Sequence, residues 1–281
     1  MATLFLVADI QGAQDAVTVL LLGVSLAVAA VPEGLPAILS VVLAIGVQRM
    51  AGRNAIVKRL SSVETLGSAS VICSDKTGTL TRSEMTIQRV ATGSGTSRVT
   101  GVGYAPEGEV LAEGGDALPP GQRAEDIVVL SGGSLAGNAR LRLGDDGEWE
   151  IQGDPTEAAF LVAERKLGVH ERRDRRFDFV REIPFTSERK MMSTLQVDRE
   201  HDGARVLIAK GAPDVLLGRC SHVRVGMETL PLDDGWRERI LGDVEAMARD
   251  ALRTLGVAYR PLAEGEGEEG GDDAALEQGL A

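Results

Sequence analysis

The residues from Val17 to Val47 form a long apolar run, and this run limits what the chain can fold into more than any other feature. It exceeds the roughly 20 residues that an apolar helix needs to cross a bilayer. No lysine or arginine precedes Arg49, whereas basic residues follow soon after it. A secretory signal peptide has a basic start and a shorter apolar core, so that alternative does not fit. The run predicts a transmembrane helix over residues 17–48, with the residues after about 48 in the cytosol.

Pro32, Glu33 and Pro36 interrupt this apolar run. A proline lacks the backbone N–H that a helix needs, so we expect the helix to open here and to leave carbonyl groups without their usual partners. A carboxylate inside a membrane is costly unless it has a function. Carbonyl and carboxylate oxygens together suit a hard cation. The interruption therefore predicts an ion site, and a kinked helix with a protonated Glu33 is the structural alternative.

The stretch from Cys73 to Thr81 reads CSDKTGTLT and follows a short apolar segment, 69–73, that predicts a buried strand. A carboxylate at the end of a strand can act as a nucleophile, so Asp75 is a candidate to attack the γ-phosphate of a nucleotide. Lys76 can offset the charge of the phosphoryl group, and the Thr-Gly-Thr turn lets the backbone approach phosphate and Mg²⁺. The structural alternative is a solvated turn, for which the same residue types are common.

The composition after the apolar run is that of a water-facing protein, and the whole chain has a net charge of -12. No basic stripe with interleaved aromatic residues is present, which argues against a nucleic acid as partner. Cys73 and Cys220 have no CxxC spacing. They fit a reduced, cytosolic setting, where we expect both to pack as small hydrophobic residues.

Three segments, 179–185, 191–197 and 205–209, have the composition of strands in an antiparallel sheet. Phe185 ends the first segment and Lys190 precedes the second, an aromatic beside positive charge that suits a nucleotide. A phenylalanine at a strand end is also a common core residue. Lys210 follows the third segment, and the next residues begin a helix, so its ammonium is expected to lie free at a cleft.

The segment from Gly153 onwards has clear signals for a helix that runs to about residue 166. Asp154 is the expected N-cap, Pro155 occupies the first helical position, and Glu157 completes a capping box. Gly168 is the expected stop. The stretch 92–121 is rich in Gly, Ser, Glu and Pro, and predicts loops and weak strands at the surface.

These motifs resemble those of the P-type ion-pumping ATPases. The stretch around Asp75 matches their phosphorylation signature. The segments PEGLP at 32–36, NAIVK at 54–58 and SVETLG at 62–67 have the order and spacing of the type II cation pumps, and look most like the calcium pumps. The resemblance runs in pieces from about residue 17 to 260 and is thin between residues 92 and 149.

The resemblance implies roles for individual residues. Asp75, with Lys76 and Thr77, would carry the catalysis, and Asp75 and Thr77 would bind Mg²⁺. The transported cation, with Ca²⁺ favoured, would be bound by Glu33 and by the backbone carbonyls of Val28, Ala29 and Val31. The residues implied for ATP are Glu157 at the adenine amino group, Phe185, Lys190, Lys210 and Arg253. Many pumps have an arginine where this chain has Ser187, so a lower affinity for ATP is expected.

The implied fold is multidomain, of the α/β and α+β classes. It has a broken transmembrane helix, the first strand of a Rossmann-like (haloacid-dehalogenase-like) phosphorylation domain, and an inserted nucleotide-binding domain with an antiparallel sheet flanked by helices. The expected parts are the end of a preceding membrane helix with an outside loop at 1–16, the membrane helix at 17–48, a stalk and the start of the phosphorylation domain at 49–85, the nucleotide-binding domain at 86–262, and an acidic, Gly-rich loop or tail at 263–281.

Three interpretations of function follow. The favoured one is a fragment of an ATP-driven cation pump in a lipid bilayer, completed by the remaining actuator, phosphorylation and membrane segments; the chain alone is then expected neither to form a stable phosphoenzyme nor to transport. The second is a membrane-tethered ATP-binding module without catalytic turnover. The third is a soluble phosphatase or mutase of the same aspartyl-phosphate superfamily. Those enzymes usually carry a second aspartate where this chain has Thr77, which disfavours the third.

Overall fold

The computed structural model describes residues 12–31, 34–76, 78–82, 84–268 and 272–281. The chain consists of two units, Met1–Asp75 and Lys76–Ala281. Glu33 and Thr77, to which the sequence assigns an ion ligand and a catalytic role, lie outside the described residues.

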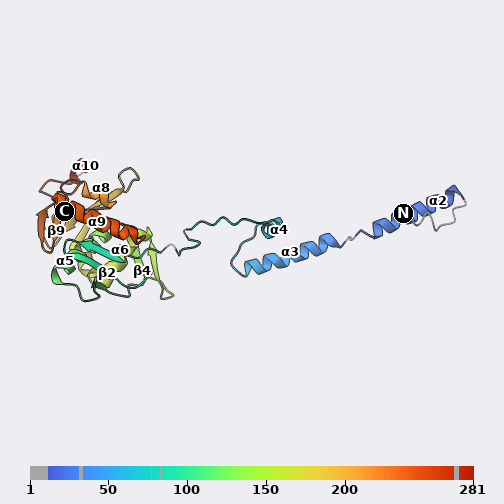
Figure 1. The fold of residues 1–281 in the computed structure, drawn as a ribbon, viewed down its shortest axis with the longest axis horizontal. Coiled ribbons are helices and arrows are strands. Elements are labelled where there is room, and N and C mark those ends of the chain that lie inside the picture. The colour runs from blue at the N-terminus through green and yellow to red at the C-terminus, as the bar shows by residue number, and fades with distance from the viewer. Residues whose placement is uncertain (1–11, 32–33, 77, 83, 269–271) are drawn as a thin grey trace. The chain divides into compact units, whose positions relative to one another are not determined.

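The apolar run of the first unit forms two helices, α2 (Ala13–Ala29) and α3 (Leu35–Ala51), instead of one (Figure 1). The interruption is where the two prolines predict it, because Pro36 is tolerated only in the first turn of α3. At the end of α2 the carbonyl of Val28 accepts the N–H of Val31 at 3.1 Å. Among the described residues, no single helix has both the length and the apolar character that crossing a bilayer requires.

The rest of the first unit has one short helix, α4 (Ser61–Gly67). The strand predicted for residues 69–73 is wrong, because the described backbone there forms neither helix nor strand. The described residues of this unit form no strand that could pair with this segment, and Val71 and Ile72 are exposed. Cys73 is exposed too, so the prediction that it is packed is wrong. Cys220 is partly buried, and burial raises the pKa of its thiol to about 11.

The second unit is built around a four-stranded antiparallel sheet in the order β11-β8-β7-β6. The strands are β6 (Phe177–Ile183), β7 (Met191–Asp198), β8 (Ala204–Gly211) and β11 (Gly256–Pro261). This confirms the predicted antiparallel segments, except that β6 ends before Phe185. Side chains alternate between the two faces of the sheet. The first face carries Leu207 and Ala209, which belong to one buried cluster. The opposite face carries Val257, which packs against a second buried cluster.

The second cluster joins helices α5 (Pro120–Leu135) and α6 (Pro155–Leu167) to a three-stranded sheet of β1 (Arg89–Thr92), β2 (Gly95–Val99) and β3 (Val110–Ala112). Each of these strands contributes a buried valine: Val90, Val99 and Val110. The surface position predicted for residues 92–121 is therefore wrong for the strands. Their valines pack with Leu130 and Phe160 in one cluster, and the burial of this apolar area stabilises the fold.

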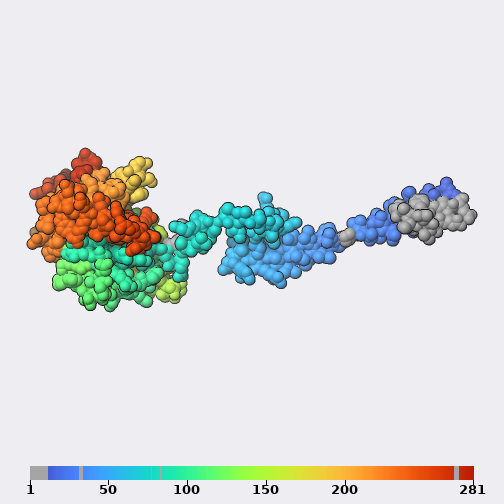
Figure 2. Space-filling model, viewed as in Figure 1, coloured from blue at the N-terminus to red at the C-terminus, as the bar shows by residue number. Residues whose placement is uncertain are grey.

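The remaining elements surround these sheets. They are β4 (Arg140–Leu143), β5 (Trp149–Gln152), α7 (His170–Arg176), α8 (Pro213–Leu217), β9 (His222–Val225), β10 (Glu228–Pro231), α9 (Asp234–Arg249) and α10 (Asp273–Leu276). In Figure 2 the orange and red C-terminal part and the green part of this unit form one continuous surface.

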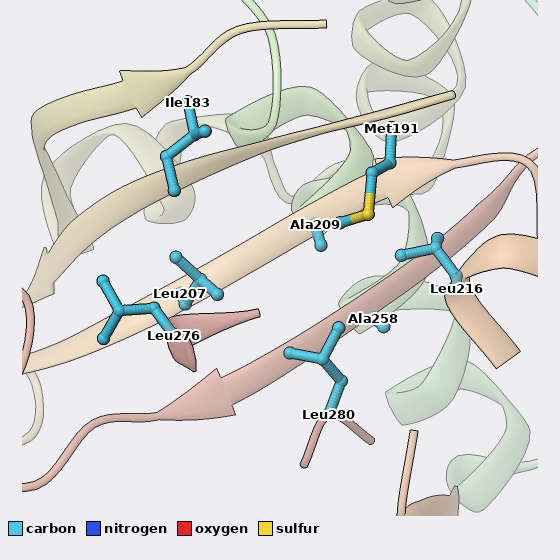
Figure 3. Packing of buried hydrophobic residues seen from close by; sticks show 8 residues of the cluster. All are labelled: Ile183, Met191, Leu207, Ala209, Leu216, Ala258, Leu276 and Leu280. Atoms are coloured by element: carbon cyan, nitrogen blue, oxygen red, sulfur yellow. The ribbon is translucent and has the colours of Figure 1, made fainter. Parts of the chain in front are cut away.

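The C-terminal residues 272–281 are packed into the second unit, although an acidic loop or tail is expected there from the sequence. Leu276 and Leu280 are buried in the cluster on the first face of the sheet. Figure 3 shows their side chains beside those of Leu207 and Ala258 on the strands. The backbones of Ala281 and Tyr259 exchange two hydrogen bonds, both of 3.0 Å. The end of the chain thus extends the core of the unit.

Candidate functional site

The strand register gathers the sequence-predicted nucleotide residues of the sheet at one of its ends. Lys210 is the next-to-last residue of β8 and pairs with Met192 of β7. Phe185 and Lys190 lie in the loop that joins β6 to β7, which leaves and re-enters the sheet at this same end. Arg253 precedes β11, whose first residue pairs with the last residue of β8. Antiparallel pairing alone therefore brings these four positions together.

The sequence predicts that the ammonium of Lys210 lies free at a cleft. This prediction is wrong, because Lys210 is buried, with 5% of the residue exposed. Its Nζ is 3.6 Å from Oε1 of Glu157 and 3.4 Å from the carbonyl of Gly133. It also lies 5.4 Å from the centroid of the Phe160 ring. Burial lowers the pKa of Lys210, and the negative charge of Glu157 opposes that change. Lys210 and Glu157 therefore form a buried ion pair at this end of the sheet.

Helix α6 holds Glu157 in this position. Its start is as predicted, since Asp154 accepts the N–H of Thr156 at 2.7 Å and Gly168 ends the helix in a left-handed conformation. The capping box is wrong, because Oε2 of Glu157 accepts two other backbone N–H groups, of Asn138 at 2.9 Å and Ala139 at 3.1 Å. Glu157 consequently links the end of α5, the start of α6 and strand β8.

Two glycines, one in the last turn of α5 and one just after the helix, make room for this pair, and local sequence signals predict a structural role for neither. A Cβ on Gly137 would be 3.0 Å from the carboxyl group of Glu157 and 3.2 Å from Nζ of Lys210. A Cβ on Gly133 would be 2.1 Å from the ring of Phe160, which α6 places against Lys210. Only the tertiary approach of α5 to α6 creates this demand, so spacing along the chain carried no signal for it.

The other predicted residues of the site are more exposed. Phe185 has 58% of its surface exposed, so its ring is available at the rim. Lys190 has a positive φ of 52°, and its backbone N–H bonds to the carbonyl of Thr186 at 2.8 Å. Arg253 is exposed as well. This end of the sheet thus combines a buried ion pair with an exposed aromatic ring and two exposed cations.

Asp75 and Lys76 are exposed; Asp75 is the last residue of the first unit, and Lys76 is the first residue of the second. The carbonyl of Lys76 accepts the N–H groups of Leu80 at 2.9 Å and Thr81 at 3.1 Å, which closes a turn. Within the described residues, no cluster of at least three His, Cys, Asp or Glu side chains could hold a metal ion. Thr77, the other expected ligand of Mg²⁺, lies outside the described residues.

Residues 128–280 match the family model of the cytoplasmic N domain of P-type ATPases. The chain belongs to the P-type ATPase family. The matched range begins within α5 and ends at Leu280, so the N domain of this P-type ATPase includes the buried pair at Lys210 and the packed C-terminal residues.

Several P-type ATPases are similar to this chain over most of its length. A calcium-transporting ATPase of Bacillus subtilis is 42% identical over 92% of the chain and 28% of the relative. A cation-transporting ATPase of Synechocystis is 43% identical over 85% of the chain and 26% of the relative. A calcium-transporting ATPase of Bos taurus, type 2C member 1, is 37% identical over 88% of the chain and 26% of the relative. The chain thus spans about a quarter of the length of these relatives.

Proposed function

We propose that this chain is the nucleotide-binding and phosphate-accepting part of an ATP-driven cation transporter, with Ca²⁺ as the favoured cation. The observation that carries the proposal is the gathering of Phe185, Lys190, Lys210 and Arg253 at one end of the four-stranded sheet. An aromatic ring and several cations around a partly buried site suit a nucleotide, which has one stackable base and a strongly negative phosphate chain.

The residues divide the recognition of ATP between them. Phe185 stacks on the base, and Glu157 accepts a hydrogen bond from the adenine amino group. Lys190 and Arg253 attract the phosphates from the rim. The Lys210 and Glu157 pair supplies fixed charge at the base of the site, where limited solvent strengthens electrostatic interactions.

In the transport reaction, a carboxylate oxygen of Asp75 bonds to the γ-phosphorus of ATP, and ADP leaves with the bridging oxygen. Water later hydrolyses the aspartyl-phosphate. Lys76 offsets charge on the phosphoryl group. Mg²⁺ belongs to the proposal through the family, with Asp75 and Thr77 as its expected ligands.

The proposed ion pathway uses the interruption between α2 and α3 in the bilayer. The backbone carbonyls of Val28, Ala29 and Val31 lie at the end of α2, where the regular helix stops. Together with Glu33 they offer oxygen ligands suited to a hard cation. The residues after about 48 would then face the cytosol. The names of two of the relatives, which are calcium-transporting ATPases, favour Ca²⁺ over other cations.

Nucleotide binding is tested first, on the whole chain, by calorimetric titration with ATP. Phe185→Ala should weaken ATP binding about tenfold, since stacking of a base on an aromatic ring contributes about 1–3 kcal/mol. Phe179→Ala is the matched control, because Phe179 is 59% exposed and Phe185 58%. Equal affinities of both variants and the unaltered chain would exclude Phe185 from the site, and no ATP binding at all would overturn the proposal.

Transport is tested in the complete transporter reconstituted in vesicles. Asp75→Asn should abolish both the acid-stable label from γ-³²P-ATP and ATP-driven ⁴⁵Ca²⁺ uptake, while ATP binding is retained. Asp174→Asn is the control, as this exposed carboxylate lies outside the proposed machinery. Full labelling of Asp75→Asn would contradict the assignment of Asp75. Binding of ATP without any label in the unaltered protein would instead favour a membrane-tethered binding module.

A further inference from the structure

The loop of residues 184–190, here called the nucleotide loop, carries both Phe185 and Lys190 and has little support from its own apolar contacts. Phe185 is mostly exposed, so no core packing fixes its ring. Within the loop, Lys190 N–H bonds to the carbonyl of Thr186, and Arg189 N–H bonds to its hydroxyl at 3.2 Å. These local bonds shape the turn near Lys190 but do not reach the backbone that precedes Phe185.

Arg189 supplies that missing connection. Its Nη1 donates to the carbonyl of Pro184 at 2.7 Å, and Pro184 directly precedes Phe185. Its Nη2 donates to Oε1 of Glu277. The guanidinium therefore bridges the start of the nucleotide loop and a carboxylate 88 residues further along the chain. A planar guanidinium held at both ends has a defined orientation.

Glu277 is itself firmly held. Only 2% of this residue is exposed, and its carboxylate also accepts the hydroxyl of Ser193 and lies 3.5 Å from Nη1 of Arg219. The residue follows α10, whose Leu276 is buried in the core, and Leu280 is buried just after it. A carboxylate fixed in this way can act as an anchor for Arg189.

This anchor approaches the sheet from the face opposite to Lys210. Ser193 and Lys210 lie on neighbouring strands, but Ser193 pairs with Ala209 and Lys210 pairs with Met192, so their side chains point to opposite faces. Glu277 is therefore placed behind the nucleotide loop and not in the site. We therefore expect Glu277 to act on a nucleotide bound beside Lys210 through the nucleotide loop, to which Arg189 connects it.

We propose that Glu277 is a positioning residue for the nucleotide loop: it holds Arg189, Arg189 holds the carbonyl of Pro184, and Phe185 is thereby presented to the base. This inference rests on the proposed nucleotide-binding function. Without the anchor the loop populates other conformations. The apparent affinity for ATP then equals the intrinsic affinity multiplied by the fraction of time that the loop spends in the binding conformation.

The test measures ATP binding to the whole chain by calorimetry, with thermal unfolding recorded for each variant. Glu277→Gln keeps the volume and one acceptor oxygen but removes the charge, and it should weaken ATP binding about tenfold if the loop retains its binding conformation for about a tenth of the time. Asp273→Asn is the matched control. Asp273 joins the same C-terminal segment to Arg181 of β6 at 2.7 Å and does not touch the nucleotide loop, so its loss should leave ATP affinity unchanged.

Arg189→Met is the second variant, because it leaves Glu277 with Ser193 and Arg219 and should fold even if Glu277→Gln does not. It should weaken ATP binding as much as Glu277→Gln. Positioning and a purely structural role differ in whether the effect of these substitutions on ATP binding depends on Phe185. In a Phe185→Ala background, neither substitution should weaken binding further, since the group being positioned is already absent.

The possible outcomes separate this inference from the proposed function. If the unaltered chain binds ATP and Phe185→Ala weakens it, the nucleotide site stands. The positioning role is then refuted if the Arg189→Met variant binds ATP as tightly as the unaltered chain. It is also refuted if Arg189→Met weakens ATP binding by the same factor in the presence and in the absence of Phe185. Failure of the unaltered chain to bind ATP refutes the proposed function first.

Discussion

Replacing Glu157 by glutamine tests whether the buried partner of Lys210 stabilises the fold. Glutamine has nearly the same volume and keeps a carbonyl oxygen that can accept the N–H groups of Asn138 and Ala139. The substitution therefore removes the negative charge beside Lys210 and little else. What remains is a buried ammonium whose nearest polar group is the carbonyl of Gly133, 3.4 Å away.

The expected loss of stability follows from the geometry of the pair. Removing one partner of a buried ion pair costs about 3–5 kcal/mol, because the other charge stays buried without compensation. The separation of 3.6 Å between Nζ and Oε1 exceeds that of a good charge-assisted hydrogen bond. We therefore expect the lower end of this range, about 3 kcal/mol at pH 7.

The loss should also depend on pH in a defined direction. Burial lowers the pKa of Lys210 in the folded state, and removing Glu157 lowers it further, because that charge favours the protonated amine. The folded state then binds fewer protons than the unfolded state, so the stability of Glu157→Gln rises with pH as Lys210 loses its proton. The difference from the unaltered protein should shrink between pH 7 and pH 9.5.

Urea unfolding followed by tryptophan fluorescence measures this, since Trp149 and Trp236 both lie in the second unit. The control is Glu150→Gln, which breaks an exposed pair with Arg142 and should cost less than about 1 kcal/mol. The reasoning is refuted if Glu157→Gln costs no more than this control. It is also refuted if the same cost persists when Lys210 is replaced by methionine.

Three further substitutions test other contacts. Gly211→Ala should destabilise the protein by about 1–3 kcal/mol, because the new Cβ would be 2.5 Å from that of Met191; thermal unfolding measures this. Asp126 is fully buried, and among the described residues neither of its carboxylate oxygens has a hydrogen bond of ordinary geometry. Burial raises its pKa to about 6, and the nearby Ser97 hydroxyl opposes that change. Because the pKa of Asp126 is higher in the folded state, this residue favours folding at low pH, and that contribution is lost as the pH rises through about 6. Asp126→Asn should therefore stabilise the protein by about 1–3 kcal/mol at pH 7.5 and by little at pH 4. Urea titrations at both pH values measure this. Glu164→Gln should cost about 3 kcal/mol in urea unfolding, the lower end of the range for a broken buried pair, because it removes the buried partner of Arg173 at 3.0 Å while Asp174 stays 3.2 Å away.

Each of these has its own control and contradicting result. Gly235→Ala is the control for Gly211, since the atom nearest to its new Cβ is 3.4 Å away, and equal costs for the two would contradict the packing argument. An effect of Asp126→Asn that is independent of pH would show that titration is not its cause. Glu171→Gln breaks an exposed pair with Arg175, and a cost as large as that of Glu164→Gln would contradict the role of burial.

Local signals in the sequence were sufficient for elements whose ends are fixed by nearby residues. Asp154, Pro155 and Gly168 set the limits of α6, because capping and a left-handed stop need only a few residues. The two prolines divided the apolar run into two helices for a similar reason. Composition and turns also placed β7 and β8 within a few residues. The strand expected at 69–73 failed, since a strand requires pairing partners that a local pattern cannot supply.

By itself, then, the sequence determined the limits of α6, the approximate places of β6, β7 and β8, and the residue types that belong at a nucleotide site. Only the tertiary structure decided which of those residues meet. It turned Glu157 from a capping residue into the partner of Lys210, buried the valines of β1 to β3, and packed Glu277 behind the nucleotide loop. The physical reason is that burial and ion pairing depend on contacts between residues far apart in the chain, and those contacts exist only once the strands have paired and the helices cover them.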